Sequence, residues 1–395
     1  MKSMASLLKV KRDDESLMLT MYWAYFVNGI MGTLIGTLLP FMKAEYRMSY
    51  VLSGAVISAH QIGNFVALLV AGFLPYLIGR KKSTVTLASG IIIGFILMTL
   101  TGNPAVLLLS FAISGIGRGA LSNIANVVMS EIAENKAASL NLLHALFAVG
   151  ALIVPFSVIL LTVTLSLDWR ANVWLLVALE SVVLILISLS SLSNQPSKRS
   201  NGGERGFLTS GDFWLNTAIL FFYLCSEASI VGWLVTYFTE GGRLSPALAQ
   251  MTSSALWLFI LAGRLVCAYL STRVKASLLL LILGLLQLLF FIILVSVDST
   301  PLIYLSIFGF GLAMSGIFPT VLSTVDIKIT GSTVAMGTIF AIATLGAIVM
   351  PVIVGVVAQT GGMAAGLGTI GIAIAVMVAL LLVKFIMAAN KRTTR

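Results

Sequence analysis

The sequence predicts an all-α membrane protein with twelve transmembrane helices in two pseudo-symmetric six-helix halves. The 395 residues have a mean hydropathy of +1.06 and only 10% charged residues, whereas a soluble domain carries about 25%. Apolar runs long enough to cross a bilayer, which takes roughly 20 residues each, follow one another along the whole chain. Glycine and proline patterns of the first half recur in the second half.

The apolar runs give the positions of the twelve expected spans. Pro104, Pro246 and Pro301 stand at the starts of runs, where a helix has no need of the missing N–H group. Residues 1–15 mix basic and acidic side chains without a small-residue cleavage site, so we expect the first run to be retained as a span. The expected spans are 18–42, 50–76, 84–101, 104–129, 138–166, 171–193, 213–238, 246–271, 277–297, 301–325, 333–359 and 364–388.

One long polar segment divides these runs into two sets of six. Residues 194–212 read NQPSKRSNGGERGFLTSGD and are rich in glycine, serine and charge, a composition typical of a linker. We therefore expect an N-terminal bundle at 1–193, a linker at 194–212 and a C-terminal bundle at 213–395.

The distribution of basic residues predicts the orientation in the membrane. The side that holds both termini and the linker carries 17 Lys and Arg residues, whereas the opposite side carries Lys43, Arg47, Arg170 and Arg243. Cytoplasmic loops carry the excess of positive charge, so both termini and the linker are expected in the cytoplasm and the protein in the plasma (inner) membrane. The net charge of +10 is explained by these loops, and we expect no nucleic-acid partner.

Three pairs of sequence features suggest that the halves are repeats. Gly115 and Gly117 match Gly309 and Gly311 at an offset of 194, and the Gly-Ala-x-x-x-Pro patterns at 150–155 and 346–351 differ by 196. The first runs of the halves start 195 residues apart, at 18 and 213. Parallel repeats of this kind place a substrate site between the halves near the bilayer midplane.

Several segments resemble the major facilitator superfamily. Residues 72–81 read GFLPYLIGRK, which is similar to the family's loop G-x-L-x-D-R-x-G-R-K, with Tyr76 and Leu77 in place of its acidic–basic pair. GIGRGAL (115–121), LNLLHALFAVGAL (140–152), W-x-x-x-x-x-G-R-L (257–265), GLAMSGIFP (311–319) and Glu227 look like the fucose–galactose–glucose proton symporters, especially bacterial glucose/mannose permeases. That branch commonly carries a carboxylate where this chain has Ser122, and Arg118 is an addition.

The resemblance implies a secondary transporter that moves a small polar solute, a hexose, together with protons by alternating access. It implies a functional monomer in the lipid bilayer whose site is lined by the first, second, fourth and fifth helices of each half. It also supports a gating role for the basic residues near the cytoplasmic side, Arg80, Arg264 and Arg273.

Glu227 and Arg118 are the leading candidates for proton coupling. Each lies 14 residues into its span, or roughly 21 Å along the axis at 1.5 Å per residue. Ionisable groups are costly at this depth and are functional candidates. Arginine keeps its charge in proteins, so Arg118 needs a carboxylate or an anionic ligand. The alternative is a purely structural ion pair between the two, and Glu180, within 171–193, is a further acid with a weaker claim.

Other polar groups inside the spans are candidate substrate contacts. Sugar hydroxyls need both donors and acceptors, and a sugar ring needs a flat apolar face, which tryptophan supplies. The same side chains could instead hold helices together or, for tryptophan, lie at the interface. The candidates are Tyr25, Asn28, His60, Gln61, Asn64, Ser122, Asn126, Asn141, His144, Trp233 and Trp257.

Two further functions compete with sugar uptake. Arg118 would suit an exporter of drugs or of an amphipathic or organic anion. A membrane sensor on the same fold would need an output domain, which the 194–212 segment does not provide. The sequence has no Walker A loop, no His/Cys cluster suited to a metal and no sign of a catalytic triad, so we expect no cofactor, no metal and no enzymatic activity.

Overall fold

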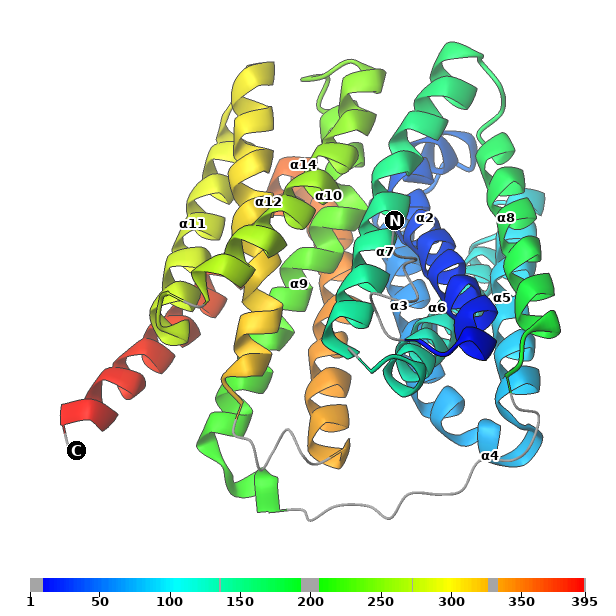
Figure 1. Ribbon diagram of the computed structural model, residues 1–395. Coiled ribbons are helices and arrows are strands. Elements are labelled where there is room, and N and C mark those ends of the chain that lie inside the picture. The colour runs from blue at the N-terminus through cyan, green and yellow to red at the C-terminus, as the bar shows by residue number, and fades with distance from the viewer. Residues whose placement is uncertain (1–9, 135, 193–205, 272, 326–332, 394–395) are drawn as a thin grey trace, which may run out of the picture. The chain divides into compact units, whose positions relative to one another are not determined.

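The computed structural model describes residues 10–134, 136–192, 206–271, 273–325 and 333–393 (Figure 1). In this part its regular secondary structure is helical, apart from one bridge between Val10 and Ala133. Ten helices among the described residues are long and apolar enough to cross a membrane. The predicted all-α class is therefore confirmed.

The chain forms two compact units. Unit 1 contains Met1–Met48 and Ala59–Arg199, and unit 2 contains Ser49–Ser58 and Ser200–Arg395. The first turns of one helix thus group with unit 2, although the polar segment at 194–212 predicts them in the N-terminal bundle. Most of that segment, 193–205, lies outside the described residues, and its end carries the short 3-10 helix η3 (Gly206–Thr209).

The helices of unit 1 follow the first six predicted spans. Their bounds are α2 (Glu15–Glu45, preceded by the 3-10 turn η1, Arg12–Asp14), α3 (Tyr50–Phe73), α4 (Pro75–Ile78), α5 (Arg80–Leu100), α6 (Pro104–Ile132), α7 (Lys136–Val158) and α8 (Arg170–Leu189).

The helices of unit 2 follow the remaining spans. They are α9 (Gly211–Glu240), α10 (Pro246–Leu270), α11 (Ala276–Ser296), α12 (Thr300–Ser323) and α14 (Thr333–Thr393). Within α14 the backbone leaves the helical region at Gly362, with φ 79° and ψ 167°. Glycine adopts positive φ at little cost, and this residue falls in the gap between the predicted spans 333–359 and 364–388.

Local sequence explains where several helices begin. The Asn103 side chain accepts hydrogen bonds from the backbone N–H groups of Ala105 (3.0 Å) and Val106 (3.4 Å) at the start of α6. Ser245 caps α10 in the same way, through the N–H of Leu248. Each cap precedes a proline at the first helical position, an arrangement that leaves few N–H groups unsatisfied.

One predicted span changes its geometry before it ends. The helix α7 stops at Val158 and continues as a π-helix, η2 (Ile159–Thr164). Asn172 of α8 supports this turn: its Nδ2 donates to Thr162 Oγ1 at 2.8 Å, and its Oδ1 accepts from Ser157 Oγ at 3.2 Å. Apolar length alone predicts a single regular helix at 138–166 and gives no sign of the wider turn.

One packing contact recurs in both units. A Cβ atom on Gly150 of α7 would lie 2.1 Å from the carbonyl oxygen of Phe26 in α2, and a Cβ on Gly346 of α14 would lie 2.2 Å from that of Phe221 in α9. The glycines are 196 residues apart and the phenylalanines 195 apart. The first and fifth helices of each half therefore approach each other at equivalent positions, as the repeat predicts.

The contacts of the fourth helices correct one predicted offset. A Cβ on Gly115 of α6 would lie 2.0 Å from the carbonyl oxygen of His60, and a Cβ on Gly311 of α12 would lie 3.2 Å from that of Leu256. Both pairs are related by 196 residues, whereas Gly309 packs against α11. The predicted pairing of Gly115 with Gly309 at an offset of 194 is therefore wrong, and Gly311 is its counterpart.

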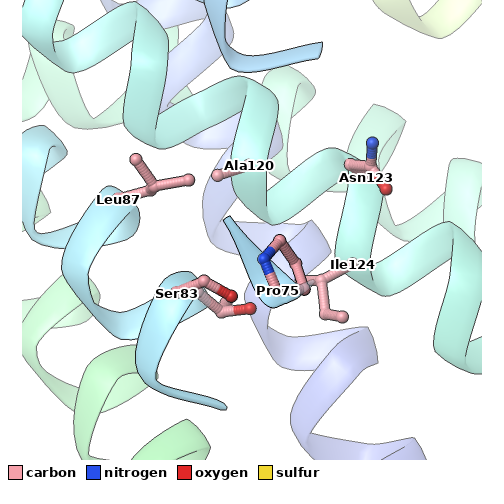
Figure 2. Close-up of a pocket in the computed structure, with 7 residues that line it drawn as sticks. Pro75, Ser83, Leu87, Ala120, Asn123 and Ile124 are labelled. Carbon is pink, nitrogen blue, oxygen red and sulfur yellow. The ribbon is translucent and has the colours of Figure 1, made fainter. Parts of the chain in front are cut away.

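Unit 1 contains a small cavity between α4, α5 and α6 (Figure 2). Its volume is about 20 Å³, which is room for roughly one water molecule. This volume is far too small for a sugar. It is lined by Pro75, Ser83, Thr84, Leu87, Ala120, Asn123 and Ile124.

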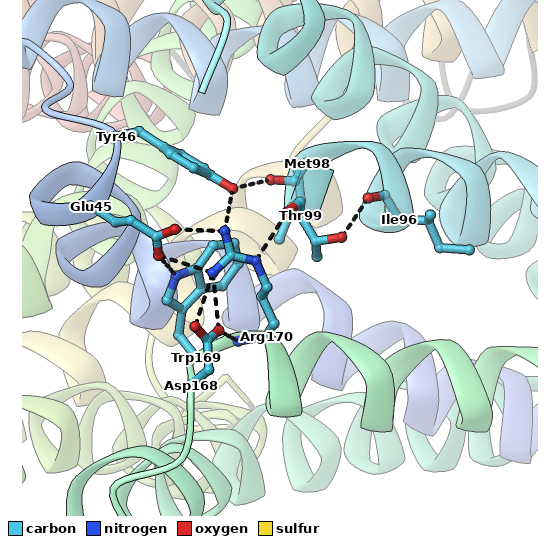
Figure 3. A network of polar contacts seen from close by, with 8 residues as sticks. All are labelled: Glu45, Tyr46, Ile96, Met98, Thr99, Asp168, Trp169 and Arg170. Carbon is cyan, nitrogen blue, oxygen red and sulfur yellow. Dashed lines mark hydrogen bonds and ion pairs between the residues drawn. The ribbon is translucent and has the colours of Figure 1, made fainter. Parts of the chain in front are cut away.

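Arg170 joins three helix ends of unit 1 (Figure 3). Its Nη2 donates to Glu45 Oε1 at 2.6 Å and to the Tyr46 hydroxyl at 3.0 Å, and its Nε donates to the Thr99 carbonyl at 3.0 Å. Asp168 accepts from Nη1 at 3.0 Å. Burial raises the pKa of Tyr46, so its hydroxyl remains a donor to Met98 O at 3.0 Å.

A buried lysine forms a comparable junction in unit 2. Lys384 of α14 donates to Asn216 Oδ1 at 2.7 Å and lies 3.5 Å from Asp212 Oδ1, both in α9. Asn216 also accepts from Thr324 Oγ1, just beyond α12. Buried charges are retained where they are paired and hydrogen-bonded, so this cluster fixes the ends of three helices.

Candidate functional site

Polar side chains predicted as substrate contacts form a connected cluster in unit 1. Asn28 of α2 donates through Nδ2 to Ser122 Oγ of α6 at 2.8 Å. One turn along α6, Asn126 donates through Nδ2 to the Tyr25 hydroxyl at 3.2 Å and to the Ser122 carbonyl at 2.7 Å. The structure therefore brings together four predicted residues that lie about 100 positions apart in the sequence.

These four residues meet because each helix carries its polar groups on one stripe. Tyr25 and Asn28 are three residues apart in α2, and Ser122 and Asn126 are four apart in α6, spacings that place side chains on the same helical face. Ser122 and Asn126 are half-buried. They are therefore not fully enclosed by the helices around them.

Aromatic rings and Arg118 continue the cluster. The Tyr25 ring packs edge-on against His144, with centres 5.3 Å apart, and lies tilted by 58° against Phe147, with centres 5.8 Å apart; both partners are in α7. The Arg118 guanidinium lies 5.8 Å from the centre of the Phe147 ring. It occupies the space beside Gly32 of α2, where a Cβ would lie 3.2 Å from Nη2. Arg118 therefore lies among the predicted substrate contacts of unit 1.

The predicted contacts from α3 lie deeper in the packing. His60 is buried, and its Nδ1 lies 3.1 Å from Ser114 Oγ, which itself donates to the Phe111 carbonyl. Nε2 has no hydrogen-bond partner among the described residues.

The other predicted contacts of unit 1 differ in their surroundings. Gln61 and Asn64 are half-buried, and Asn64 Oδ1 would lie 2.8 Å from a Cβ on Gly119 in α6. Asn64 thus belongs to the packed face between α3 and α6. The side chain of Asn141 lies outside the described part of the molecule.

Glu227 has a defined environment in unit 2. It accepts a hydrogen bond from the hydroxyl of Tyr223, one turn earlier in α9, at 3.0 Å. Tyr223 is buried and Glu227 is half-buried. Glu227 and Arg118 belong to different units, so their coupling stays a prediction.

Two of the predicted aromatic contacts are buried in unit 2. Trp233 is 0% exposed, and its Nε1 donates to the Pro351 carbonyl at 3.3 Å. Its ring lies 6.3 Å from that of Tyr50. This environment is typical of a packing residue, and we expect Trp233 to have that role rather than to hold a sugar ring. Trp257 is also buried, at 7% exposure.

The predicted gating residues differ in their contacts and in their burial. Arg80 forms a bidentate salt bridge with Glu131 of α6: Nη1 donates to Oε2 at 2.6 Å and Nη2 donates to Oε1 at 2.9 Å. This pair joins the start of α5 to the end of α6. Arg264 is half-buried, whereas Arg273 is exposed with its guanidinium 5.3 Å from the centre of the Tyr269 ring. A role in gating stays a prediction for all three.

Several residues beside the predicted ones give no signal in the sequence. Phe147 contacts both Tyr25 and Arg118, and Tyr223 bonds Glu227. The rings of Phe318 and Phe340 stack in unit 2. Phenylalanines are expected everywhere in apolar spans, so only the spacing of Tyr223 from Glu227, one helical turn, could have indicated a contact.

The family follows from a comparison with known proteins. A profile of the Major Facilitator Superfamily matches residues 21–332, which is most of the chain. The chain belongs to the Major Facilitator Superfamily. It is therefore a multi-pass membrane transporter and not an enzyme, as the sequence predicts.

Sequence relatives within this superfamily include sugar transporters. The galactose-proton symporter of Escherichia coli (strain K12) is 25% identical over 195 residues, which are 47% of this chain and 41% of the symporter. The arabinose-proton symporter of Bacillus subtilis (strain 168) is 32% identical over 110 residues, 28% of this chain and 24% of that one. The matched region thus spans less than half the length of these curated relatives.

Solved structures with the same fold have more varied names. The nucleoside transporter NupG superposes with a TM-score of 0.72 at 16% identity, covering 94% of this chain and 98% of its own. The human organic anion transporter MFSD10 (TETRAN) superposes with a TM-score of 0.67 at 14% identity, covering 94% and 100%. At these identities the likeness shows the fold alone.

Proposed function

We propose that this superfamily member is a secondary active transporter that moves a small polar solute, a hexose, coupled to protons by alternating access. The observation that carries the proposal is the polar cluster of Tyr25, Asn28, Ser122 and Asn126 inside the membrane-spanning helices of unit 1. Amides and hydroxyls offer both donors and acceptors, as sugar hydroxyls require. The similarity to galactose-proton and arabinose-proton symporters supports the same substrate class.

The proposed topology has twelve spans with both termini in the cytoplasm. Ten helices of the described chain satisfy the length and hydropathy of a span, and α3 and the division of α14 at Gly362 supply the other two. The charge asymmetry between alternate loops supports the orientation. We place the protein in the plasma (inner) membrane as a functional monomer.

Glu227 is the proposed carrier of the coupled proton. It is a half-buried acid in the first helix of its half, held by the Tyr223 hydroxyl. Acidic side chains within membrane-spanning helices commonly serve as proton carriers in transporters. Arg118 would favour release when alternating access brings its charge close, and the substrate would compete for Arg118.

Transport by purified protein in proteoliposomes tests this mechanism. Wild-type protein should accumulate labelled hexose only under an inward proton gradient. Glu227→Gln should lose at least about tenfold of that accumulation, because the amide cannot carry the proton, but should retain counterflow exchange of substrate. Undiminished accumulation in Glu227→Gln would rule out Glu227 as the carrier.

Glu180 provides the matched control. It is also an acid within a span, and it is 0% exposed with neither carboxyl oxygen hydrogen-bonded among the described residues. Glu180→Gln removes the same charge with the same shape. We expect this variant to accumulate substrate as wild type does; if it failed where Glu227→Gln succeeded, the coupling role would move to Glu180.

Arg118 favours a second candidate, transport of an organic anion. Its guanidinium lies among the polar cluster, over the Phe147 ring, and a fixed positive charge is what a carboxylate or phosphate ligand needs. The fold shared with the organic anion transporter MFSD10 is consistent with this alternative. Competition of hexose uptake by hexuronates, which differ from hexoses by one carboxylate, would distinguish the two.

A further inference from the structure

The two units carry different chemistry at equivalent positions. With the offsets of 195 for α2 and α9 and 196 for α6 and α12, Asn28 corresponds to Tyr223 and Ser122 to Phe318. Asn28 and Ser122 share a hydrogen bond of 2.8 Å. Their counterparts share a ring contact instead, with the centres of Tyr223 and Phe318 5.8 Å apart. The same contact between helices is therefore polar in unit 1 and aromatic in unit 2.

The fifth helices of the two halves, α7 and α14, also differ in chemistry at equivalent positions. At the offset of 196, His144 of α7 corresponds to Phe340 of α14. The Phe340 ring stacks on Phe318 with centres 6.1 Å apart and planes 14° apart. Tyr223, Phe318 and Phe340, which we call the ring platform, thus come from three helices of unit 2.

We expect the ring platform to face the protein interior and not lipid. In unit 1 the equivalent face carries Asn28, Ser122 and Asn126, and polar side chains of spans face the protein interior or a water-filled path because lipid cannot bond them. Repeats place equivalent residues on equivalent faces. Glu227 lies one turn beyond Tyr223 on this face, and an acid there would be equally costly in lipid.

The ring platform is partly open. Phe318, Phe340 and Glu227 are half-buried rather than buried. Gly337, one turn before Phe340 in α14, is exposed, and a Cβ there would have no atom within 4 Å. In the same unit the rings of Phe310 and Phe291 are buried against each other, whereas those of Phe318 and Phe340 are not fully covered.

We propose that the ring platform is a substrate subsite that binds the flat apolar face of a ring while Glu227 accepts a hydrogen bond from a donor at the ring's edge. This inference rests on the proposed function, since it specifies the solute as cyclic. The pyranose form of a hexose has such a face, formed by its C–H groups, with hydroxyl donors at the edge. A nucleoside offers the same chemistry through its base and its ribose hydroxyls.

Phe318 and Phe340 are thereby specificity-determining residues. An open-chain polyol carries hydroxyl groups on every carbon, much as a hexose does, but has no rigid ring face. The subsite should favour the cyclic solute over the open chain, and this preference should depend on the phenylalanine rings. Leucine keeps the apolar volume at these positions and removes the ring face.

The test uses the full-length protein in proteoliposomes, with labelled glucose and uridine as substrates and sorbitol as an open-chain competitor. Phe318→Leu and Phe340→Leu should each raise KM for the transported ring about tenfold, the effect of losing one aromatic contact, with a smaller change in kcat. The preference for glucose over sorbitol should fall by a similar factor. Transport of glucose would identify the cyclic solute as a hexose, and transport of uridine would identify it as a nucleoside.

Phe308→Leu is the control. Phe308 lies in the same helix, is 41% exposed and packs edge-on against Phe259 away from the ring platform, so KM should not change. An unchanged KM in both platform variants, with wild-type protein active, would overturn the subsite but leave the proposed function intact. No transport of either ring by wild-type protein would overturn the proposed function, and the subsite with it.

Discussion

Substitution of Ser122 can test whether this residue contributes to solute binding or only to helix packing. Its hydroxyl accepts from Asn28 Nδ2 and is half-buried, so Ser122→Ala leaves the amide of Asn28 without its partner. Unmade hydrogen bonds of this kind cost about 1–3 kcal/mol. We expect KM for the solute to rise roughly fivefold or more, measured by initial rates of uptake in proteoliposomes.

Ser110→Ala tests whether the serine change itself matters. Ser110 lies in the same helix, but its hydroxyl donates to the Leu107 carbonyl of its own α6, and the helical backbone is otherwise satisfied. We expect wild-type KM for this variant. Equal effects of the two substitutions would show that Ser122 acts through helix packing and not through the polar cluster.

The sequence singles out the polar residues that meet in unit 1, but it does not single out the phenylalanines that meet in unit 2. Tyr25, Asn28, Ser122 and Asn126 are predictable because amides and hydroxyls are rare and costly in spans. Phe318 and Phe340 are not, because phenylalanine is ordinary in an apolar helix and only tertiary contacts show which rings meet. Trp233 is the opposite case: the sequence singles it out as an aromatic suited to a sugar, and the structure places it fully buried, so its role in binding stays a prediction.

At the scale of elements, Arg170 should contribute more to stability than other surface arginines. Its guanidinium bonds Glu45, Tyr46, Asp168 and the Thr99 carbonyl, and stacks on Trp169 at 4.6 Å. Because the Arg170 side chain is 25% exposed, solvent screens its ion pairs and they contribute less to stability than buried ones would. The number and geometry of these bonds still lead us to expect a loss of about 1–3 kcal/mol in Arg170→Ala.

Thermal unfolding in detergent, followed by circular dichroism, measures this effect. Arg170→Lys should recover only part of the loss, since an ammonium cannot reproduce the planar, forked donors. Arg243→Ala is the comparison: its side chain is 26% exposed, but its acidic partner Asp298 is 81% exposed. A larger loss of stability in Arg243→Ala than in Arg170→Ala would contradict the assignment of Arg170 as the main junction.

Helix positions were predictable because length and hydropathy set them, but helix geometry was not. The ends at Asn103 and Ser245 follow from local capping chemistry. The π-helix at Ile159–Thr164 depends on Asn172, which reaches it from α8. A contact between separate helices of this kind has no periodic signature in the sequence.

At the scale of the whole molecule, the two halves of the repeat could be aligned correctly only from the packing contacts between their helices. The helix at 300–323 contains Gly309, Gly311 and Gly316, so glycine spacing alone permits more than one register. The close approaches of Gly115 to His60 and of Gly311 to Leu256 select the offset of 196. That two-residue correction is what pairs Ser122 with Phe318 and so locates the ring platform.

The orientation of the whole chain can be tested because the native cysteines are poorly accessible. Cys225 and Cys267 are free and buried, at 3% and 5% exposure, so a membrane-impermeant maleimide should label wild-type protein little in intact cells. Ser299, just before α12, lies in a loop with few basic residues and is predicted outside. Ser200, in the polar segment at 194–212, is predicted inside.

Single cysteines at these positions give opposite expectations. Ser299→Cys should react with the impermeant maleimide in intact cells, whereas Ser200→Cys should react only after the membrane is permeabilised. The uptake of labelled hexose by each variant shows that the protein is folded. Labelling of Ser200→Cys in intact cells would place the linker outside, and because successive spans alternate in direction, it would reverse the predicted side of both termini and of Arg80.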